Sequence, residues 1–142
     1  MARTKSGKCL LLEAKAYIEE AVDYSSKATN LQSISLMSSA LDEAKKAFQA
    51  TPEAPWNSPY YQYANRLAHL YYLWGLNRVD AYLVFVYFAD ARDVPKPCSH
   101  DEWSGAIRLM KKSLGLHDNE YGARTAEVII SVPEMVSSSK CD

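Results

Sequence analysis

Glu13 and Lys15 are the two residues of this sequence whose types and spacing best suit chemistry. They lie two positions apart in the apolar stretch CLLLEAKAYIEE, so in a β-strand both side chains point to the same face. Burying an unpaired charge is costly, and a structural strand gains nothing from one. Carboxylates bind Mg²⁺, a divalent cation activates water against a phosphodiester, and a nearby lysine stabilises the charge that develops.

The same spacing also has a plain structural explanation. A Glu-x-Lys pair occurs by chance in most proteins, and on an amphipathic strand the two residues form a solvated charged pair. The elements that would position Glu13 and Lys15 therefore decide between the two interpretations.

Three stretches are predicted to be strands. Leu10–Ala16 follows a turn at Gly7 and Lys8. Ala81–Ala89, AYLVFVYFA, is β-branched and aromatic and is apolar on both faces. Such a run is typical of a central parallel strand that helices cover. The last strand lies in AEVIISVPE and ends at Pro133.

The first predicted helix follows a polar stretch, residues 17–30, which we expect to be a loop with a helical turn. Apolar residues recur at helical spacing from Leu31 onward. The helix should end near Ala50, because the Thr-Pro step that follows disfavours helical backbone.

Two further helices are predicted from their end signals. In the second, Ser58 would be the N-cap, Pro59 the first helical residue and Gly75 the C-cap. In the third, Ser99 and Glu102 have the spacing of a capping box. Its core face would consist of Trp103, Ala106, Ile107 and Met110.

The order strand, helix, helix, strand, helix, strand predicts an α/β fold with a small parallel or mixed sheet and crossover helices. We expect Leu10–Ala16 and Ala81–Ala89 to be adjacent parallel strands that the first two helices link. Residues 1–136 should form one domain, and residues 137–142 a polar tail.

Four segments resemble, in this order, a bacterial branch of the PD-(D/E)XK nuclease superfamily. They are LLLEAKAYIEE, YYQYANRLAHLYYL, VDAYLVFVYFAD and EWSGAIRLMKKSLGL, and the resemblance extends over residues 8–132. It implies a restriction-endonuclease-like core, in which one strand carries the (D/E)xK pair and a crossover helix leads to a parallel neighbour. Glu13 and Lys15 match the catalytic acid and lysine. Glu13 and the carbonyl of Ala14 would bind Mg²⁺ or Mn²⁺, weakly, and we expect no other cofactor.

The resemblance also implies a substrate-binding role for polar residues on the crossover helix. Gln62, Asn65 and Arg66 lie three and four positions apart, which places them on one ridge. Arg66 would meet a phosphate there. A helix-surface or capping role is the alternative for this arginine.

One departure from the family pattern concerns its essential aspartate, which belongs to a strand upstream of the Glu-x-Lys strand. No acidic residue precedes Glu13. We therefore expect a core truncated at its N-terminus, with residues 1–4 as the end of the missing strand. The replacement carboxylate would come from a partner subunit, or from Asp80, Glu19 or Glu20. The apolar edge of Leu10–Ala16 would lack a neighbour, and this predicts a homodimer or larger oligomer.

Composition narrows the classes of partner. Sixteen basic and seventeen acidic residues give a net charge of −1, so the charge does not support a nucleic-acid partner, although it is compatible with a local basic patch. No apolar stretch is long enough for a membrane span, and we expect a cytoplasmic protein without a membrane partner. The three cysteines and three histidines have no metal-ligand spacing.

Three functions follow from different classes. The first is a catalytically disabled nuclease-like domain that acts as an oligomeric binding or interaction protein. The second is an active metal-dependent nuclease with a carboxylate from another subunit or a relocated residue. The third is a structural or regulatory α/β protein in which Glu13 and Lys15 are a charged pair. The neutral composition and the absent aspartate favour the first, which predicts no nuclease activity with Mg²⁺ or Mn²⁺.

Overall fold

The computed structural model describes residues 2–22, 30–117 and 121–132. One sheet has the strand order β1-β2-β3-β4. Its strands are β1 (Ala2–Arg3), β2 (Cys9–Lys15), β3 (Ala81–Ala89) and β4 (Thr125–Ser131). β2, β3 and β4 are parallel, whereas β1 pairs antiparallel with β2. The predicted α/β class and the predicted parallel pairing of the first two long strands are confirmed.

Three α-helices link the strands: α1 (Leu31–Ala47), α2 (Tyr61–Leu70) and α3 (His100–Ser113). A π-helical segment, η2 (Tyr71–Leu76), continues α2 to the start of β3. Short 3₁₀ turns, η1 (Ile18–Ala21) and η3 (Gly122–Arg124), follow β2 and precede β4. Among these described helices, none is both long and apolar enough to cross a membrane.

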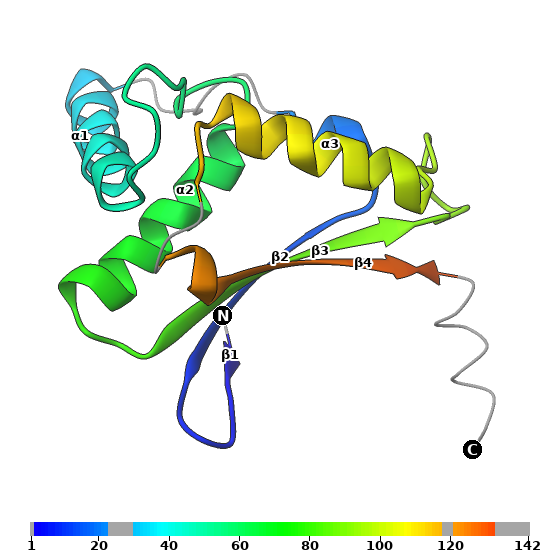
Figure 1. The fold of residues 1–142 in the computed structure, drawn as a ribbon, viewed down its shortest axis with the longest axis horizontal. Helices are drawn as coiled ribbons and strands as arrows, with labels where there is room; N and C mark the ends of the chain where they lie inside the picture. Colours follow the sequence, from blue (N-terminus) through cyan, green and yellow to red (C-terminus); the bar gives the residue numbers. More distant parts are fainter. Residues whose placement is uncertain (1, 23–29, 118–120, 133–142) are drawn as a thin grey trace.

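All three α-helices lie on the same side of the sheet (Figure 1). α2 and α3 pack on the strands, and α1 packs on α2 and η2. The strands follow sequence order across the sheet, so crossovers of the usual right hand lie on one side. The expectation that helices cover β3 therefore holds for one face only within the described residues.

Each strand consequently has a covered face and an open face. On β3 the side chains toward the helices are buried, among them Leu83, Phe85 and Tyr87, while the alternating residues are part-exposed. We use the name "open face" for the outward side chains of Leu12, Val84, Val86, Phe88, Val128 and Ile130. These positions follow from the register, which pairs Leu12 with Val84 and Val86 with Val128.

The edge of β2 differs from the prediction of a strand without a neighbour. β1 pairs with its first two residues, Cys9 and Leu10, through a hairpin that turns at Gly7. Leu11 to Lys15 have no strand on that side in the described part of the chain. The predicted tail, residues 137–142, and Pro133 lie outside the described residues.

Two predicted end signals of the second helix are wrong. α2 begins at Tyr61 and not at Pro59, because the first helical hydrogen bond is the one that the Ala64 N–H donates to the Tyr60 carbonyl (3.1 Å). Gly75 lies inside η2 and does not end it. A Cβ atom at Gly75 would lie 2.6 Å from the Tyr121 hydroxyl, so this glycine permits a close approach of side chains.

The end signals of α3 are confirmed. The Ser99 hydroxyl accepts a hydrogen bond from the Glu102 N–H (3.3 Å), and the Glu102 carboxylate accepts one from the Ser99 N–H (2.7 Å). Trp103 is buried against the sheet, and its indole N–H donates to the Phe88 carbonyl (3.0 Å). The capping box thus fixes where α3 begins, and the Trp103 contact joins the helix to β3.

Candidate functional site

Glu13 and Lys15 lie on the covered face of β2, beneath α2. The Glu13 carboxylate makes two charged contacts: Oε1 lies 3.2 Å from Lys15 Nζ, and Oε2 accepts a hydrogen bond from Arg66 Nε (2.7 Å). Lys15 Nζ also donates to Gln62 Oε1 (2.5 Å). The structure therefore brings together four of the predicted site residues, two from a strand and two from the crossover helix.

The cluster is mostly enclosed by the protein. The side chains of Glu13 and Lys15 are each only 14% exposed, and Arg66 reaches them from the more accessible surface of α2. Burial raises the pKa of the Glu13 carboxyl, but the hydrogen bond and charge of Arg66, with those of Lys15, outweigh it. The pKa of Glu13 is therefore held below its ordinary value, and the residue is ionised at neutral pH.

The two remaining predicted site residues are Ala14 and Asn65. The prediction for Ala14 concerns its backbone carbonyl; its side chain is exposed on the opposite side of β2. Asn65 lies on α2, where its carbonyl oxygen is 2.8 Å from His69 Nδ1. Among the described contacts it has no hydrogen bond to Glu13 or Lys15.

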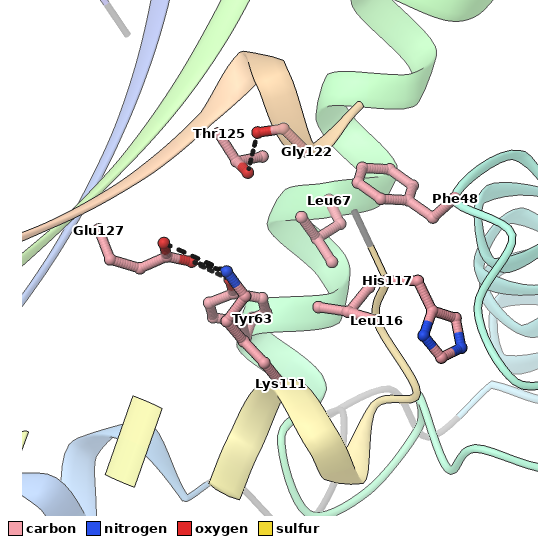
Figure 2. Close-up of a pocket in the computed structure, with 9 residues that line it drawn as sticks. All are labelled: Phe48, Tyr63, Leu67, Lys111, Leu116, His117, Gly122, Thr125 and Glu127. Atoms are coloured by element: carbon pink, nitrogen blue, oxygen red, sulfur yellow. Dashed lines mark hydrogen bonds and ion pairs between the residues drawn. The ribbon is translucent and has the colours of Figure 1, made fainter. Parts of the chain in front are cut away.

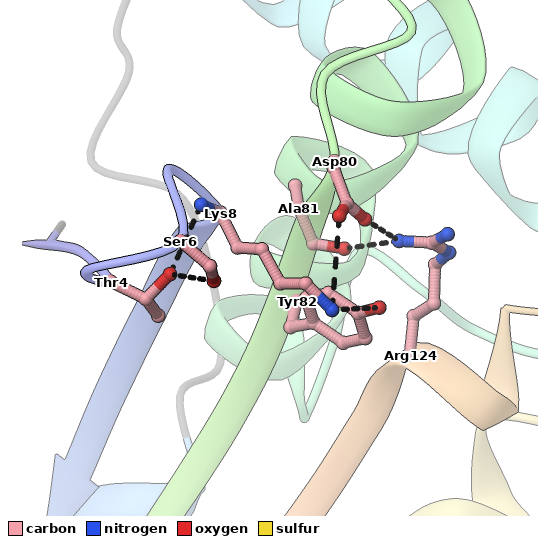
Figure 3. Close-up of polar contacts among 7 residues, drawn as sticks. All are labelled: Thr4, Ser6, Lys8, Asp80, Ala81, Tyr82 and Arg124. Carbon is pink, nitrogen blue, oxygen red and sulfur yellow. Dashed lines mark hydrogen bonds and ion pairs between the residues drawn. The ribbon is translucent and has the colours of Figure 1, made fainter.

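The three acidic residues proposed to replace the missing carboxylate each have partners elsewhere. Asp80, just before β3, pairs with Arg124 at 2.7 Å and with Lys8 at 3.9 Å. Figure 3 draws both contacts. Glu19 pairs with Lys96, and Glu20 accepts a hydrogen bond from the Ala16 N–H (2.7 Å). Over the described ranges, no group of three or more His, Cys, Asp or Glu residues could hold a metal ion.

Sequence reasoning missed a second carboxylate on the covered face, Glu127 of β4. The sheet register aligns Glu13, Phe85 and Glu127 in one row. Glu127 accepts a hydrogen bond from the Tyr63 hydroxyl (2.6 Å), and its carboxylate lies 3.3 Å from Lys111 Nζ of α3 (Figure 2). The signal was present, since Glu127 is the one acidic residue within β4 and alternates with Ala126 and Val128.

Aromatic rings separate the two carboxylates. The ring of Tyr63 stacks on that of Phe85 with centroids 4.0 Å apart and planes 8° from parallel. Burial, and then the charge of Glu127, raise the pKa of the Tyr63 hydroxyl well above its ordinary value, so it stays a donor. The covered face thus holds two paired carboxylates, Glu13 with two cations and Glu127 with one, and an aromatic stack lies between them.

Two cavities adjoin these groups. The first cavity is lined in part by Glu13, Lys15, Gln62 and Phe85. Its volume is about 10 Å³, which is room for about one water molecule. The other is about 90 Å³ and lies beside Glu127, between α2 and the segment after α3 (Figure 2). Neither is large enough to enclose a nucleotide.

The fold and the cluster define a small α/β protein in which Glu13 and Glu127, on the helix-covered face of the sheet, are both ion-paired. Comparisons of the chain with protein-family models, with curated proteins and with solved structures find no match.

Proposed function

We propose that this chain is a nuclease-like α/β protein that acts by binding and does not cleave phosphodiesters. The resemblance to the PD-(D/E)XK superfamily supplies the first half of the proposal. The observation that carries the second half is the pairing of Glu13, both of whose carboxylate oxygens face a cation. The residue that would bind a metal ion in an active relative is occupied by the protein's own side chains.

Electrostatics argues against a divalent cation at Glu13. One carboxylate beside Lys15 and Arg66 leaves the cluster with an excess of one positive charge. Two unit charges 4 Å apart interact by about 4 kcal/mol at an effective dielectric constant near 20. Mg²⁺ would meet about twice that repulsion from each cation, and a single carboxylate does not offset it.

Space argues in the same direction. A phosphodiester and its attacking water would have to approach Glu13 and Lys15 together. The cavity that these residues line has room for about one water molecule. Bond cleavage here would require α2 to move away from the sheet.

A cleavage assay tests the proposal. Supercoiled plasmid and single-stranded DNA would be incubated with the whole chain and Mg²⁺ or Mn²⁺. We expect no cleavage above the level of a Glu13→Ala variant. Cleavage that is lost in Glu13→Ala but kept in the control Glu43→Ala, which removes an exposed carboxylate of α1, would contradict a non-catalytic function.

A metal-dependent nuclease remains the second candidate because Glu13 and Glu127 share one row of the sheet. Two strand spacings separate their backbones, roughly 9.5 Å. The Tyr63–Phe85 stack fills the space between them, and Glu127 has its own partners. Glu127→Ala in the same assay tests this candidate, which requires both carboxylates for cleavage.

A further inference from the structure

We propose that the open face of the sheet is the surface on which a second copy of this chain docks, face to face. The inference rests on the proposed function, because it names the partner of a protein that acts by binding. It assigns the contact to the face of the sheet, and not to the edge of β2.

The open face is apolar and unpartnered in the described part of the chain. All three helices lie on the other side of the sheet (Figure 1). Leu12 is 50% exposed and Val128 is 40% exposed, although both are large apolar side chains. None of the outward positions of β2, β3 and β4 carries a charge. A contiguous apolar surface of this kind marks an interaction site more often than a free surface.

The absence of charge selects the kind of partner. Nucleic acid requires cations along the contact, and the open face has none. A second copy presents the same uncharged surface, so a twofold axis brings apolar groups together without like-charge repulsion. Two twisted sheets can pack in this way with their strands about 30° apart and a layer roughly 10 Å thick between them.

The polar rim at one end of the open face also argues against a lipid surface. Figure 3 shows Lys8 and Arg124 beside Tyr82. The Lys8 ammonium lies 5.0 Å and the Arg124 guanidinium 4.8 Å from the centroid of the tyrosine ring. Both also pair with Asp80. Asp80 offsets one of these two charges, so the rim keeps a net charge of +1, whereas surfaces that bind anionic lipids carry clusters of about four or more cations.

The size of the face sets the expected affinity. Seven paired positions on three strands give a footprint of roughly 300 Å², from a rise of about 3.3 Å per residue and a strand spacing of about 4.8 Å. The area that becomes buried is larger than this flat footprint, because side chains protrude from the sheet and residues around the face also make contact. The contact still belongs to the small end of protein interfaces, so we expect a reversible dimer with a micromolar dissociation constant.

Sedimentation equilibrium of the whole chain between about 1 and 500 μM tests the proposal. We expect the mass to rise with concentration from the 16.0 kDa of one chain toward twice that value. The double variant L12K/V128K should remain at 16.0 kDa throughout. The matched control L36K/L109K adds the same charges at exposed leucines of α1 and α3 and should dimerise like the parent chain.

Far-UV circular dichroism would verify that each variant is folded, and L12K alone replaces the double variant if that protein does not fold.

A parent chain that stays monomeric at 500 μM overturns the proposal. A dimer that persists in the face variants also overturns it and favours the edge of β2. Binding of the monomer to vesicles of neutral or anionic phospholipid would also overturn the proposal, because the partner of the open face would then be a membrane and not a second copy. None of these results depends on DNA cleavage, so the dimer and the absence of catalysis can fail separately.

Discussion

The two faces of the sheet reverse the usual distribution of charge. The face that α2 and α3 cover contains Glu13, Lys15 and Glu127, whereas no outward position of the three long strands carries a charge. Each of these part-buried charges has a partner of opposite sign, and this pairing makes its partial burial tolerable. The side chains of the open face are apolar, and no other described element of the chain covers them.

The contrast shows that the covered face stabilises the packing of the helices on the sheet, whereas the open face favours association with another surface. Paired charges on the covered face fix where α2 and α3 sit on the sheet, because an ion pair has a defined geometry and an apolar contact has little. An apolar face without helices favours association with any surface that excludes water. The covered face therefore serves the fold, and we propose that the open face serves binding.

The largest expected effect compares neighbouring residues of β3 on opposite faces. Phe85→Ala removes a buried ring that stacks on Tyr63 and should lower the free energy of unfolding by about 3–5 kcal/mol. Val84→Ala, on the open face, should cost about 1 kcal/mol in the monomer. Urea denaturation at low micromolar concentration measures both. Equal losses would mean that the two faces are equally packed and would break the comparison.

The next effect concerns the charged cluster. Glu13→Gln leaves Lys15 and Arg66 without their anion on the covered face and should cost about 2–3 kcal/mol, less than a fully buried pair would. Glu19→Gln, at an exposed pair with Lys96, should leave the urea midpoint unchanged. A double-mutant cycle of Glu13→Gln with Arg66→Met should give a coupling of about 1 kcal/mol or more. Additive losses of stability would mean that Arg66 and Glu13 do not interact.

The pH dependence of stability follows from the lowered pKa of Glu13. The folded protein binds the Glu13 proton less tightly than the unfolded chain, whose carboxyl has the ordinary value of 4.5. Its stabilisation is therefore complete above that pH and is lost as the pH falls through the lower folded value. The difference in unfolding free energy between the parent and Glu13→Gln should shrink over that range. A difference that grows toward acid would require a raised pKa instead.

The smallest effect concerns two tyrosines on the covered face. The Tyr87 hydroxyl is buried and has no hydrogen-bond partner in the described part of the chain, whereas the Tyr63 hydroxyl donates to Glu127. Tyr87→Phe should raise the unfolding free energy by up to about 1 kcal/mol. Tyr63→Phe should lower it by about 1–2 kcal/mol. A loss in both variants would indicate that Tyr87 has a partner too.

Much of the fold could be predicted because the relevant signals are local. β-branched and aromatic content identified β3 at its observed bounds, and the Ser99–Glu102 spacing identified the start of α3. The coverage of the sheet could not be predicted in this way. β3 is apolar on both faces, and a strand sequence does not state whether a helix or another chain covers each face.

The sequence predicted which candidate site residues share one element, but not which of them contact one another across elements. The spacing of Gln62 and Arg66 placed them on one ridge of α2, but it did not reveal that this ridge lies over β2 or that Arg66 contacts Glu13. Glu127 escaped because its relation to Glu13 depends on the pairing of β3 with β4, and sheet register is a tertiary property.

The most direct test of the central claim is whether a divalent cation binds beside Glu13. Amide resonances of the whole ¹⁵N-labelled chain would be recorded during a titration with Mn²⁺, which broadens the signals of nearby nuclei. Because Lys15 and Arg66 face both carboxylate oxygens, we predict no selective broadening at Glu13, Ala14 or Lys15 at millimolar Mn²⁺. Selective broadening at these residues that disappears in Glu13→Gln would contradict the account.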